Sequence, residues 1–388
     1  METELLEFGE IFTRAFVLFW PVWIALAVVM VPSFFVRGRL GLYGQLYDSG
    51  VGFFGLFLVL FWLFTAIFAD VIIQLDPLAQ LSGMKRALPG APIAGGDHAY
   101  DVYLFGGDNL ARDVFTRLVK GSQTVLAIAP AATLFAFMVG ITLGLPAGFY
   151  GGKIDTFLSF LANLVLAFPV ILLFYLLVTP GIRETAIPVA MAGVLFIFPV
   201  IFFAVFFWSR YSTRPEIVYY QMAAVLGIGG WMYIGLAFNA DPLGVFSMHA
   251  NTLIIFVSVV FVNSPTVFRI VRGLTLDIKT RDYVAAAQTR GERPWYIMLW
   301  EILPNARGPL IVDLCLRIGY TTILLGTLGF FGLGVSPESP DWGLSINEGR
   351  ALWRSVVHVA LPPALALMTL VLGLNLLADG LREQSLKD

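Results

Sequence analysis

The chain has 388 residues, of which 58% are hydrophobic and only 13% are charged. A soluble globular domain has roughly 45–50% apolar and about 25% charged residues, so this composition excludes a soluble enzyme. The formal net charge of -2 argues against a nucleic-acid-binding protein, which would carry a basic face. With Cys315 as the single cysteine and only three histidines, we expect neither an internal disulfide nor a metal site.

Nine charge-poor apolar stretches predict membrane-spanning helices, because a bilayer crossing needs about 20 mainly apolar residues. The sixth stretch is the weakest, because four glycines lower its helical preference and leave a re-entrant segment as the alternative. The predicted fold class is therefore an all-α polytopic membrane protein with about nine helices. In chain order the stretches cover residues 15–36, 50–69, 125–147, 157–178, 187–208, 222–238, 252–268, 307–332 and 356–378.

Lys and Arg in the short connections predict which loops face the cytoplasm. Residues 269–307 hold seven Lys and Arg against four Asp and Glu, so we assign this segment to the cytoplasm. Alternating outward from it places residues 209–221, residues 151–155 and Arg37 with Arg39 inside. The acidic N-terminus then lies outside, together with the long segment 76–120, and the C-terminus lies in the cytoplasm. The acidic start is the reverse of a signal peptide, so we expect the first span to be retained.

The most informative stretch is DYVAAAQTRGERPWYIMLWEILPN, residues 282–305, a polar and helix-prone run between two spans. Three small residues, Ala285 to Ala287, would let the surface of another protein approach the helix backbone. Gly291 permits the turn with positive φ that ends such a helix. From these residues alone, an ordinary cytoplasmic loop is an equally good interpretation.

This stretch resembles the EAA loop of ABC importer permeases, with matches at Ala286, Ala287, Gly291 and the ILPN sequence of residues 302–305. Two further blocks are similar to the C-type permease subunit of the dipeptide and oligopeptide importers, the peptide, nickel and opine family. They are FGGDNLARDVFTRLVKGSQTVL at 105–126 and LGFFGLGVSPESPDWG at 328–343.

One departure from the family pattern lies in the EAA loop itself. Ala285 stands where that family often has Glu, so one polar contact is either missing or supplied by Asp282.

The resemblance implies the transmembrane domain of a type I ABC importer with six core helices. It assigns residues 1–49 to an extra N-terminal helix and linker, and residues 50–120 to the first core helix and an extracytoplasmic segment. Residues 121–388 then form the permease core, with an insertion at about 181–250 that contains a helical hairpin. For the two additions, bracing a partner permease or holding lipid is favoured over a direct role with substrate.

The resemblance also implies a mechanism, in which the loop docks as a coupling helix on a cytoplasmic ATPase. The partners would be a second permease subunit, two ATPase subunits, an extracytoplasmic solute-binding protein and membrane lipid, in a bacterial inner membrane. No G-x-x-x-x-G-K-[ST] occurs in the chain, so we expect no cofactor here, with ATP and Mg on the ATPase subunits. The residues expected to couple to the ATPase are Asp282, Ala285, Ala286, Ala287, Arg290, Gly291 and Arg293.

Two further patterns lie within the predicted spans. Gly140, Gly144 and Gly148 repeat every four residues, which predicts close helix packing rather than a substrate role. Asp313 and Arg317 are four residues apart, and charges are costly inside a membrane. A structural pair near the cytoplasmic end is favoured for them. Lining of the translocation path is the alternative.

The function that we predict is a permease subunit of an ATP-driven, binding-protein-dependent importer for peptides or peptide-like solutes. A polytopic membrane enzyme would need convergent nucleophile, base or metal ligands, and the sequence shows no such set in suitable positions. A secondary transporter would need coupling charges or interrupted helices near the midplane, for which Asp313 and Arg317 are the only candidates. The sequence does not specify the solute.

Overall fold

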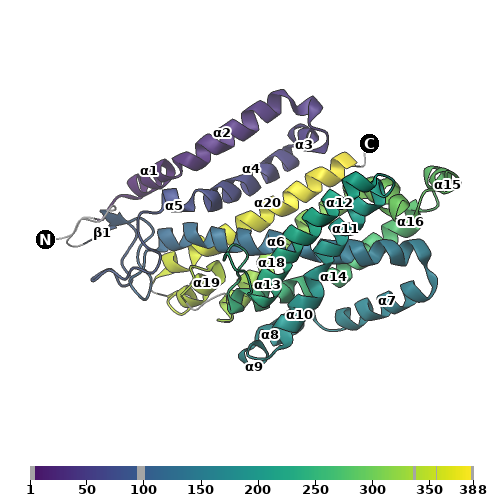
Figure 1. Cartoon of the computed structure of the whole chain (residues 1–388). Helices are drawn as coiled ribbons and strands as arrows, with labels where there is room; N and C mark the ends of the chain where they lie inside the picture. Colours follow the sequence, from purple (N-terminus) through teal and green to yellow (C-terminus); the bar gives the residue numbers. More distant parts are fainter. Residues whose placement is uncertain (1–4, 94–100, 335–337, 355, 386–388) are drawn as a thin grey trace. The chain divides into compact units, whose positions relative to one another are not determined.

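The computed structural model describes residues 5–93, 101–334, 338–354 and 356–385, and most of these residues are helical (Figure 1). The chain divides into two compact units, one of residues 1–130 and 315–388 and one of residues 131–314. Two long helices, α6 (Val114–Tyr150) and α18 (Arg307–Phe330), contribute residues to both units.

Seven helices in the described part of the chain are long and apolar enough to cross a membrane, and up to nine if each of two bent helix pairs is one span. Each of the nine predicted stretches matches one of these helices or pairs, which confirms the all-α polytopic fold class. The predicted span 125–147 is part of α6, which begins eleven residues earlier because the polar residues before it are helical as well. The seven spans are Gly50–Ile67, Val114–Tyr150, Ile187–Tyr211, Pro215–Phe238, Ala250–Ile278, Arg307–Phe330 and Val357–Gln384.

The predicted spans 15–36 and 157–178 are the two bent pairs rather than straight helices. The first pair bends by 55° and the second by 79°. Pro21 lies in the first turn of the second helix of the first pair, and Pro169 directly precedes the second helix of the other. Proline has no N–H to donate and disfavours helical backbone at the preceding residue, so the hydrogen-bond ladder is interrupted at both places.

In the first unit, α4 and α20 pack along their length and α2 lies against α4 (Figure 1). Glycines permit the close approach, since a Cβ added at Gly55 would lie 2.4 Å from the backbone nitrogen of Leu377. A short antiparallel pair, β1 with β2, aligns Ala91 with Tyr103. The remaining elements of this unit are α1 (Phe8–Leu18), α2 (Trp20–Phe35), η1 (Arg37–Arg39), α3 (Leu42–Gln45), η2 (Leu46–Asp48), α4 (Gly50–Ile67), α5 (Ala69–Ile72), β1 (Ala91–Pro92), β2 (Val102–Tyr103), α19 (Trp342–Arg350), η5 (Val357–Val359) and α20 (Leu361–Ser385).

In the second unit, α14 is the central helix and packs against α7, α8 and α10. The glycine stripe of α6 lies against α14, because a Cβ added at Gly140, Gly144 or Gly148 would come within 2.9 Å of a side chain of α14. This contact confirms the predicted close packing. The elements are α7 (Gly152–Leu166), α8 (Val170–Val178), α9 (Pro180–Arg183), α10 (Ile187–Leu195), α11 (Ile197–Tyr211), α12 (Pro215–Ala224), η3 (Val225–Gly229), α13 (Gly230–Phe238), α14 (Ala250–Ile278), α15 (Asp282–Thr289), α16 (Pro294–Tyr296), η4 (Ile297–Ile302) and α17 (Leu303–Asn305).

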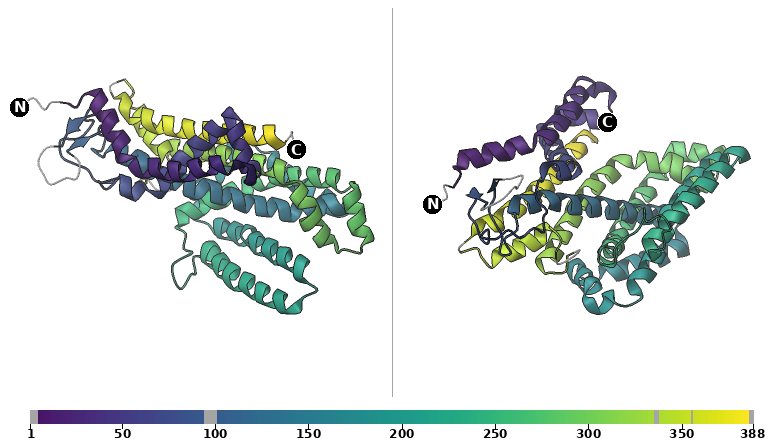
Figure 2. Two further views of the ribbon diagram at one scale, coloured as in Figure 1. Left: turned by 90° about the horizontal axis from the view of Figure 1, so that it is seen from above. Right: turned by 60° about the vertical axis from the view of Figure 1, so that its left-hand side comes forward.

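The segment between α8 and α14, which we predicted to be an insertion, contains a hairpin in which α10 and α11 run out and α12 and α13 return beside them (Figure 2). We call residues 187–238 the inserted hairpin. Its glycine-rich return is helical, and three of its glycines lie in or beside the π-helical turn η3 rather than in a re-entrant loop.

Candidate coupling site

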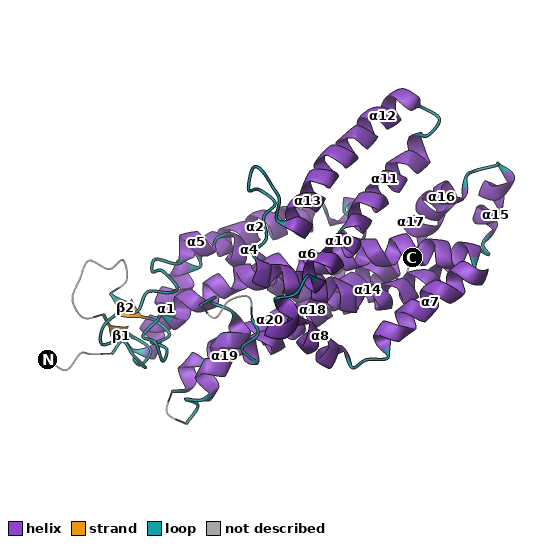
Figure 3. Cartoon of the chain, turned by 60° about the horizontal axis from the view of Figure 1, so that its bottom comes forward, coloured by secondary structure: helices purple, strands orange, loops and turns teal. Residues whose placement is uncertain are grey.

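The predicted coupling helix is α15, which follows α14 after a three-residue connection (Figure 3). It ends in a Schellman motif, in which the N–H of Gly291 donates to Gln288 O at 2.9 Å and the N–H of Glu292 donates to Ala287 O at 3.2 Å. Gly291 has φ 77°, a left-handed conformation that glycine adopts without strain. The predicted helix end at Gly291 is confirmed.

The structure separates the three alanines of this helix. Ala285 and Ala286 are exposed, whereas Ala287 is fully buried together with Val284. These two buried residues are three positions apart and therefore share one face of the helix. Ala287 thus packs inside the chain, and its side chain does not lie on the exposed face where we expected it. The other residues expected to couple to the ATPase are all exposed, namely Asp282, Arg290, Gly291 and Arg293.

The buried face of α15 rests on residues 294–305, which we call the platform. Val284 and Ala287 join an apolar cluster with Ile297, Met298 and Ile302 of the π-helical turn η4. On the surface, Arg290 Nη2 donates to Glu301 Oε1 at 3.0 Å and so links the end of α15 to the platform. The helix therefore presents small exposed side chains from a packed base.

Three segments that we predicted to share the cytoplasmic face lie at one end of the second unit. Lys279 Nζ, just after α14, donates to Gly148 O at 2.8 Å, next to the turn at Gly151 and Gly152. Trp300 Nε1 of the platform donates to Ser209 Oγ at 3.0 Å, at the start of the 209–221 connection. These contacts are consistent with the predicted topology.

Asp313 and Arg317 both lie on α18. Arg317 is buried, Asp313 is half-buried, and each takes part in at least one bonding or electrostatic interaction. Neither residue belongs to α15 or to the platform.

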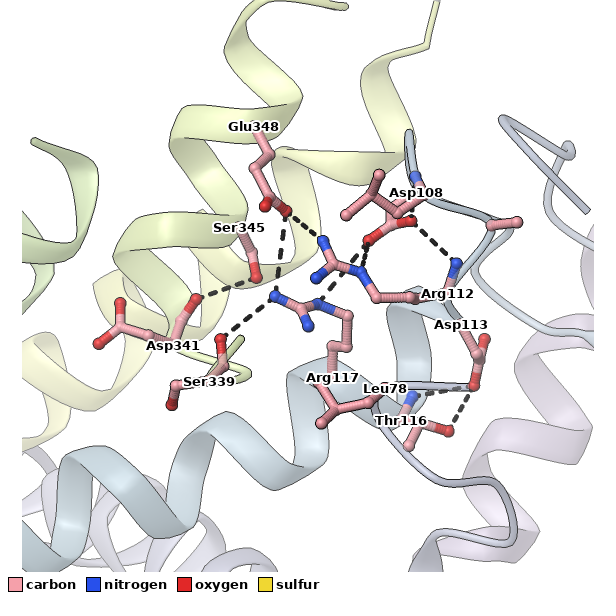
Figure 4. A network of polar contacts seen from close by, with 12 residues as sticks. Leu78, Asp108, Arg112, Asp113, Thr116, Arg117, Ser339, Asp341, Ser345 and Glu348 are labelled. Carbon is pink, nitrogen blue, oxygen red and sulfur yellow. Dashed lines mark hydrogen bonds and ion pairs between the residues drawn. The ribbon is translucent and has the colours of Figure 1, made fainter. Parts of the chain in front are cut away.

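A buried ionic network in the first unit was not predicted (Figure 4). Arg112 lies between two carboxylates, with Nε at 2.6 Å from Asp108 Oδ2 and Nη2 at 2.6 Å from Glu348 Oε2. Arg117 Nη2 donates to Ser339 O at 3.3 Å and lies 3.9 Å from Glu348 Oε2. The signal was present in the sequence, because four charges within residues 108–117 of such a charge-poor chain need partners.

The same region joins the two sequence blocks that resemble peptide-importer permeases. Trp342 is fully buried, and its Nε1 donates to Leu118 O at 2.8 Å. Gly121 lies so close to the later block that an added Cβ would lie 2.4 Å from Pro340 O. Residues 105–126 and 339–348 therefore form one packed, ion-paired assembly, which we call the polar lock.

Asp113 caps the start of α6 within the polar lock. Its carboxylate accepts hydrogen bonds from the backbone N–H of Thr116 at 2.9 Å and from the Thr116 hydroxyl at 2.6 Å. Burial raises the pKa of Asp113 to about 6 despite these bonds. Burial likewise raises the pKa of Asp341 above its usual value.

Comparison with known proteins shows where the chain belongs. Residues 217–385 match the family described as binding-protein-dependent transport system inner membrane component. The chain is 31% identical over 278 residues to a glutathione transport system permease protein of Pectobacterium atrosepticum, which covers 72% of this chain and 70% of the relative.

It is also similar to two dipeptide transport system permease proteins. The one from Alkalihalophilus pseudofirmus is 27% identical over 339 residues, covering 87% of this chain and 86% of the relative. The one from Haemophilus influenzae is 28% identical over 332 residues, covering 85% and 88%. The helical fold, the EAA-like segment and these matches agree, and the chain belongs to the family of binding-protein-dependent inner membrane components, the permease subunits of ABC importers.

Proposed function

We propose that this permease subunit carries peptides or peptide-like solutes and that α15 is its contact to the ATPase. Family membership makes the chain a transport subunit rather than an enzyme, working with a separate ATPase and a solute-binding protein. The observation that supports the coupling role best is the exposed pair Ala285 and Ala286 on a helix whose opposite face is locked into the platform. Such a helix can bind in a cleft of a partner protein, because the packing of its buried face keeps it from shifting.

The test uses two neighbouring exposed alanines and the complete importer. Ala286→Glu should leave the permease abundant in the membrane but abolish co-purification of the ATPase, because a bulky charge would be desolvated in the contact. Ala285→Glu is the matched control and should retain the ATPase, because it restores the residue that the resembling family often has there. Retention of the ATPase by Ala286→Glu at normal expression would contradict the coupling role.

The proposed solute class and assembly rest on the relatives, which are named for dipeptide and glutathione transport. We propose a heterodimer of this chain with a second permease subunit, carrying two ATPase subunits. Native mass spectrometry of the purified complex should show one copy of this chain. Two copies would contradict the heterodimer, and failure of any peptide to stimulate uptake or ATP hydrolysis would contradict the solute class.

For Asp313 and Arg317 we propose a structural pair near the cytoplasmic end, with the translocation path as the competing role. A pair predicts that Asp313→Asn and Arg317→Gln each lower the amount of folded protein, and that the double variant regains part of it. Normal protein amounts with altered uptake in both single variants would instead assign them to the path.

We propose that the N-terminus is extracytoplasmic and the C-terminus cytoplasmic. Within the first unit, Leu6 N donates to Gly90 O at 3.1 Å, which joins the start of the chain to the segment predicted outside. Ser49 Oγ donates to Glu383 Oε2 at 3.1 Å, which joins the 37–49 region to the C-terminal end. In a Cys315→Ser background, Glu7→Cys should be labelled from outside and Arg39→Cys only after permeabilisation. If both cysteines were labelled from the same side, the bent α1–α2 pair would not cross the membrane.

A further inference from the structure

The inserted hairpin contacts the platform through one face of the last turns of α11. Phe206, Ser209 and Arg210 are spaced three and four residues apart, and all three meet the indole of Trp300. The ring centroids of Phe206 and Trp300 are 4.6 Å apart, and the Arg210 guanidinium carbon lies 4.2 Å from the Trp300 ring centroid. Ser209 is 4% exposed and accepts the indole N–H. Trp300 is therefore held on its face and at its edge.

A second contact holds the start of the platform. The guanidinium carbon of Arg293 lies 5.4 Å from the ring centroid of Trp208, the neighbour of Ser209 on α11. The hairpin thus contacts Arg293, directly before the platform, and Trp300 within the η4 turn of the platform. Figure 3 shows α11 extending beside α16, with α12 on the other side of α11.

The contacts continue from the hairpin to the coupling helix. Glu301 follows Trp300 and pairs with Arg290, and Val284 and Ala287 pack on the same π-helical turn. The orientation of α15 therefore depends on that of the platform, and the platform is anchored to α11. Buried indole N–H groups require an acceptor, so loss of Ser209 or Arg210 would release this anchor.

We propose that the inserted hairpin is a positioning element that holds the platform and α15 at a fixed angle, so that closure of the ATPase moves the permease helices. The resemblance to six-helix permeases predicts that this hairpin is an addition to the core. The inference rests on the proposed coupling role of α15. It identifies Ser209 and Arg210 as positioning residues that act through Trp300.

The test measures solute uptake and ATP hydrolysis by the complete importer in proteoliposomes with its solute-binding protein. Arg210→Gln should retain the ATPase but lower the uptake per ATP hydrolysed by roughly threefold, because the cation–aromatic contact is lost. Arg210→Lys, which keeps the charge over the ring, should regain most of that ratio. The matched control is Arg214→Gln, which removes the same charge from an exposed residue of the same connection and should keep the wild-type ratio.

A double variant tests the route through Trp300. In a Trp300→Leu background, Arg210→Gln should cause no further loss of uptake per ATP. An undiminished effect there, or a wild-type ratio in the Arg210→Gln single variant, would overturn the proposal. If Arg210→Gln did not accumulate, Ser209→Ala would give the same measurement with a smaller change in the side chain.

The two proposals fail separately. Loss of the ATPase in Ala286→Glu together with a normal ratio in Arg210→Gln would remove only the positioning role. Retention of the ATPase in Ala286→Glu would remove the coupling role, and the positioning role with it.

Discussion

The polar lock and residues 282–305, α15 with its platform, which we call the coupling segment, both hold a helix end in place, but they use opposite chemistry. The polar lock joins parts of the chain that are distant in sequence, whereas the coupling segment joins neighbouring ones. In the polar lock, Arg112, Asp108 and Arg117 are paired with side-chain exposures of 2–4%. In the coupling segment, the interior is apolar and the ion pair of Arg290 with Glu301 lies on the surface. A buried ion pair adds little stability over an apolar equivalent, but losing one partner is costly. The lock thus specifies one arrangement, whereas the coupling segment keeps its charges at the surface.

The largest expected effect comes from breaking the lock. Arg112→Leu removes the cation 2.6 Å from the buried Asp108 carboxylate and from the half-buried Glu348, and leaves only Arg117 at 3.9 Å from each. This loss should cost about 3–5 kcal/mol of unfolding free energy. Thermal unfolding of the purified chain in detergent measures the loss. Lys85→Leu, which changes an exposed residue of the segment before α6, is the control and should change little. Equal midpoints for both variants would contradict the buried network.

The pH dependence of stability tests the lock at a second residue. With its pKa raised to about 6, Asp113 keeps its proton in the folded state up to about pH 6, whereas the unfolded chain releases it near the ordinary pKa of an aspartate, about 3.9. Between these values the folded state binds more protons, so stability should fall as pH rises from about 4 to about 6.

Asp113→Asn cannot ionise and retains the helix cap. The free energy of unfolding of this variant should therefore exceed that of the wild type by up to about 3 kcal/mol at pH 7.5, and the two values should be equal near pH 4. Parallel unfolding curves of the two proteins across this range would contradict the raised pKa.

Apolar packing in the second unit is tested at the contact between α6 and α14. Gly144→Leu would force a side chain into Val271, because even a Cβ at Gly144 lies 2.9 Å from it, and should cost about 1–3 kcal/mol. The matched change is Gly273→Leu on α14, where an added Cβ meets nothing within 4 Å. Equal unfolding midpoints would show that the glycine stripe does not set this packing.

The smallest effect is expected at the exposed pair of the coupling segment. Glu301→Gln removes the charge opposite Arg290, and should change the unfolding free energy by at most about 1 kcal/mol. A loss as large as that of Arg112→Leu would remove the distinction between the two regions. The same thermal unfolding measurement decides it.

Hydropathy predicted the spans because each needs a long apolar stretch, and this signal is local. The bends required a second local signal: Pro21 and Pro169 mark both breaks, but each lies within an apolar stretch that hydropathy alone scores as continuous. Hydropathy also left out the first eleven residues of α6, because Arg117 and Lys120 are helical without being apolar.

At the candidate site, the end of the helix was predictable because backbone geometry determines it. Which side chains are buried was harder to predict, because packing determines that. Gly291 signalled the helix end because few other residues adopt its conformation. Three successive alanines, however, do not show which of them faces inward. The pairing of Val284 with Ala287 was the available signal, and the structure confirms that face as buried. The partner of Arg112, Glu348, lies 236 residues away, a separation that no local pattern reveals.

The Schellman motif that ends α15 makes the proposed coupling helix a separate structural unit. Arg281 is in an extended conformation before it and Gly291 is left-handed after it, so the backbone defines both ends of an eight-residue insert. Only Val284 and Ala287 are buried within it, which leaves six positions whose side chains can vary without disturbing the fold. If α15 is the contact that we propose, six surface positions could be changed to suit another ATPase while Val284, Ala287 and Gly291 are kept.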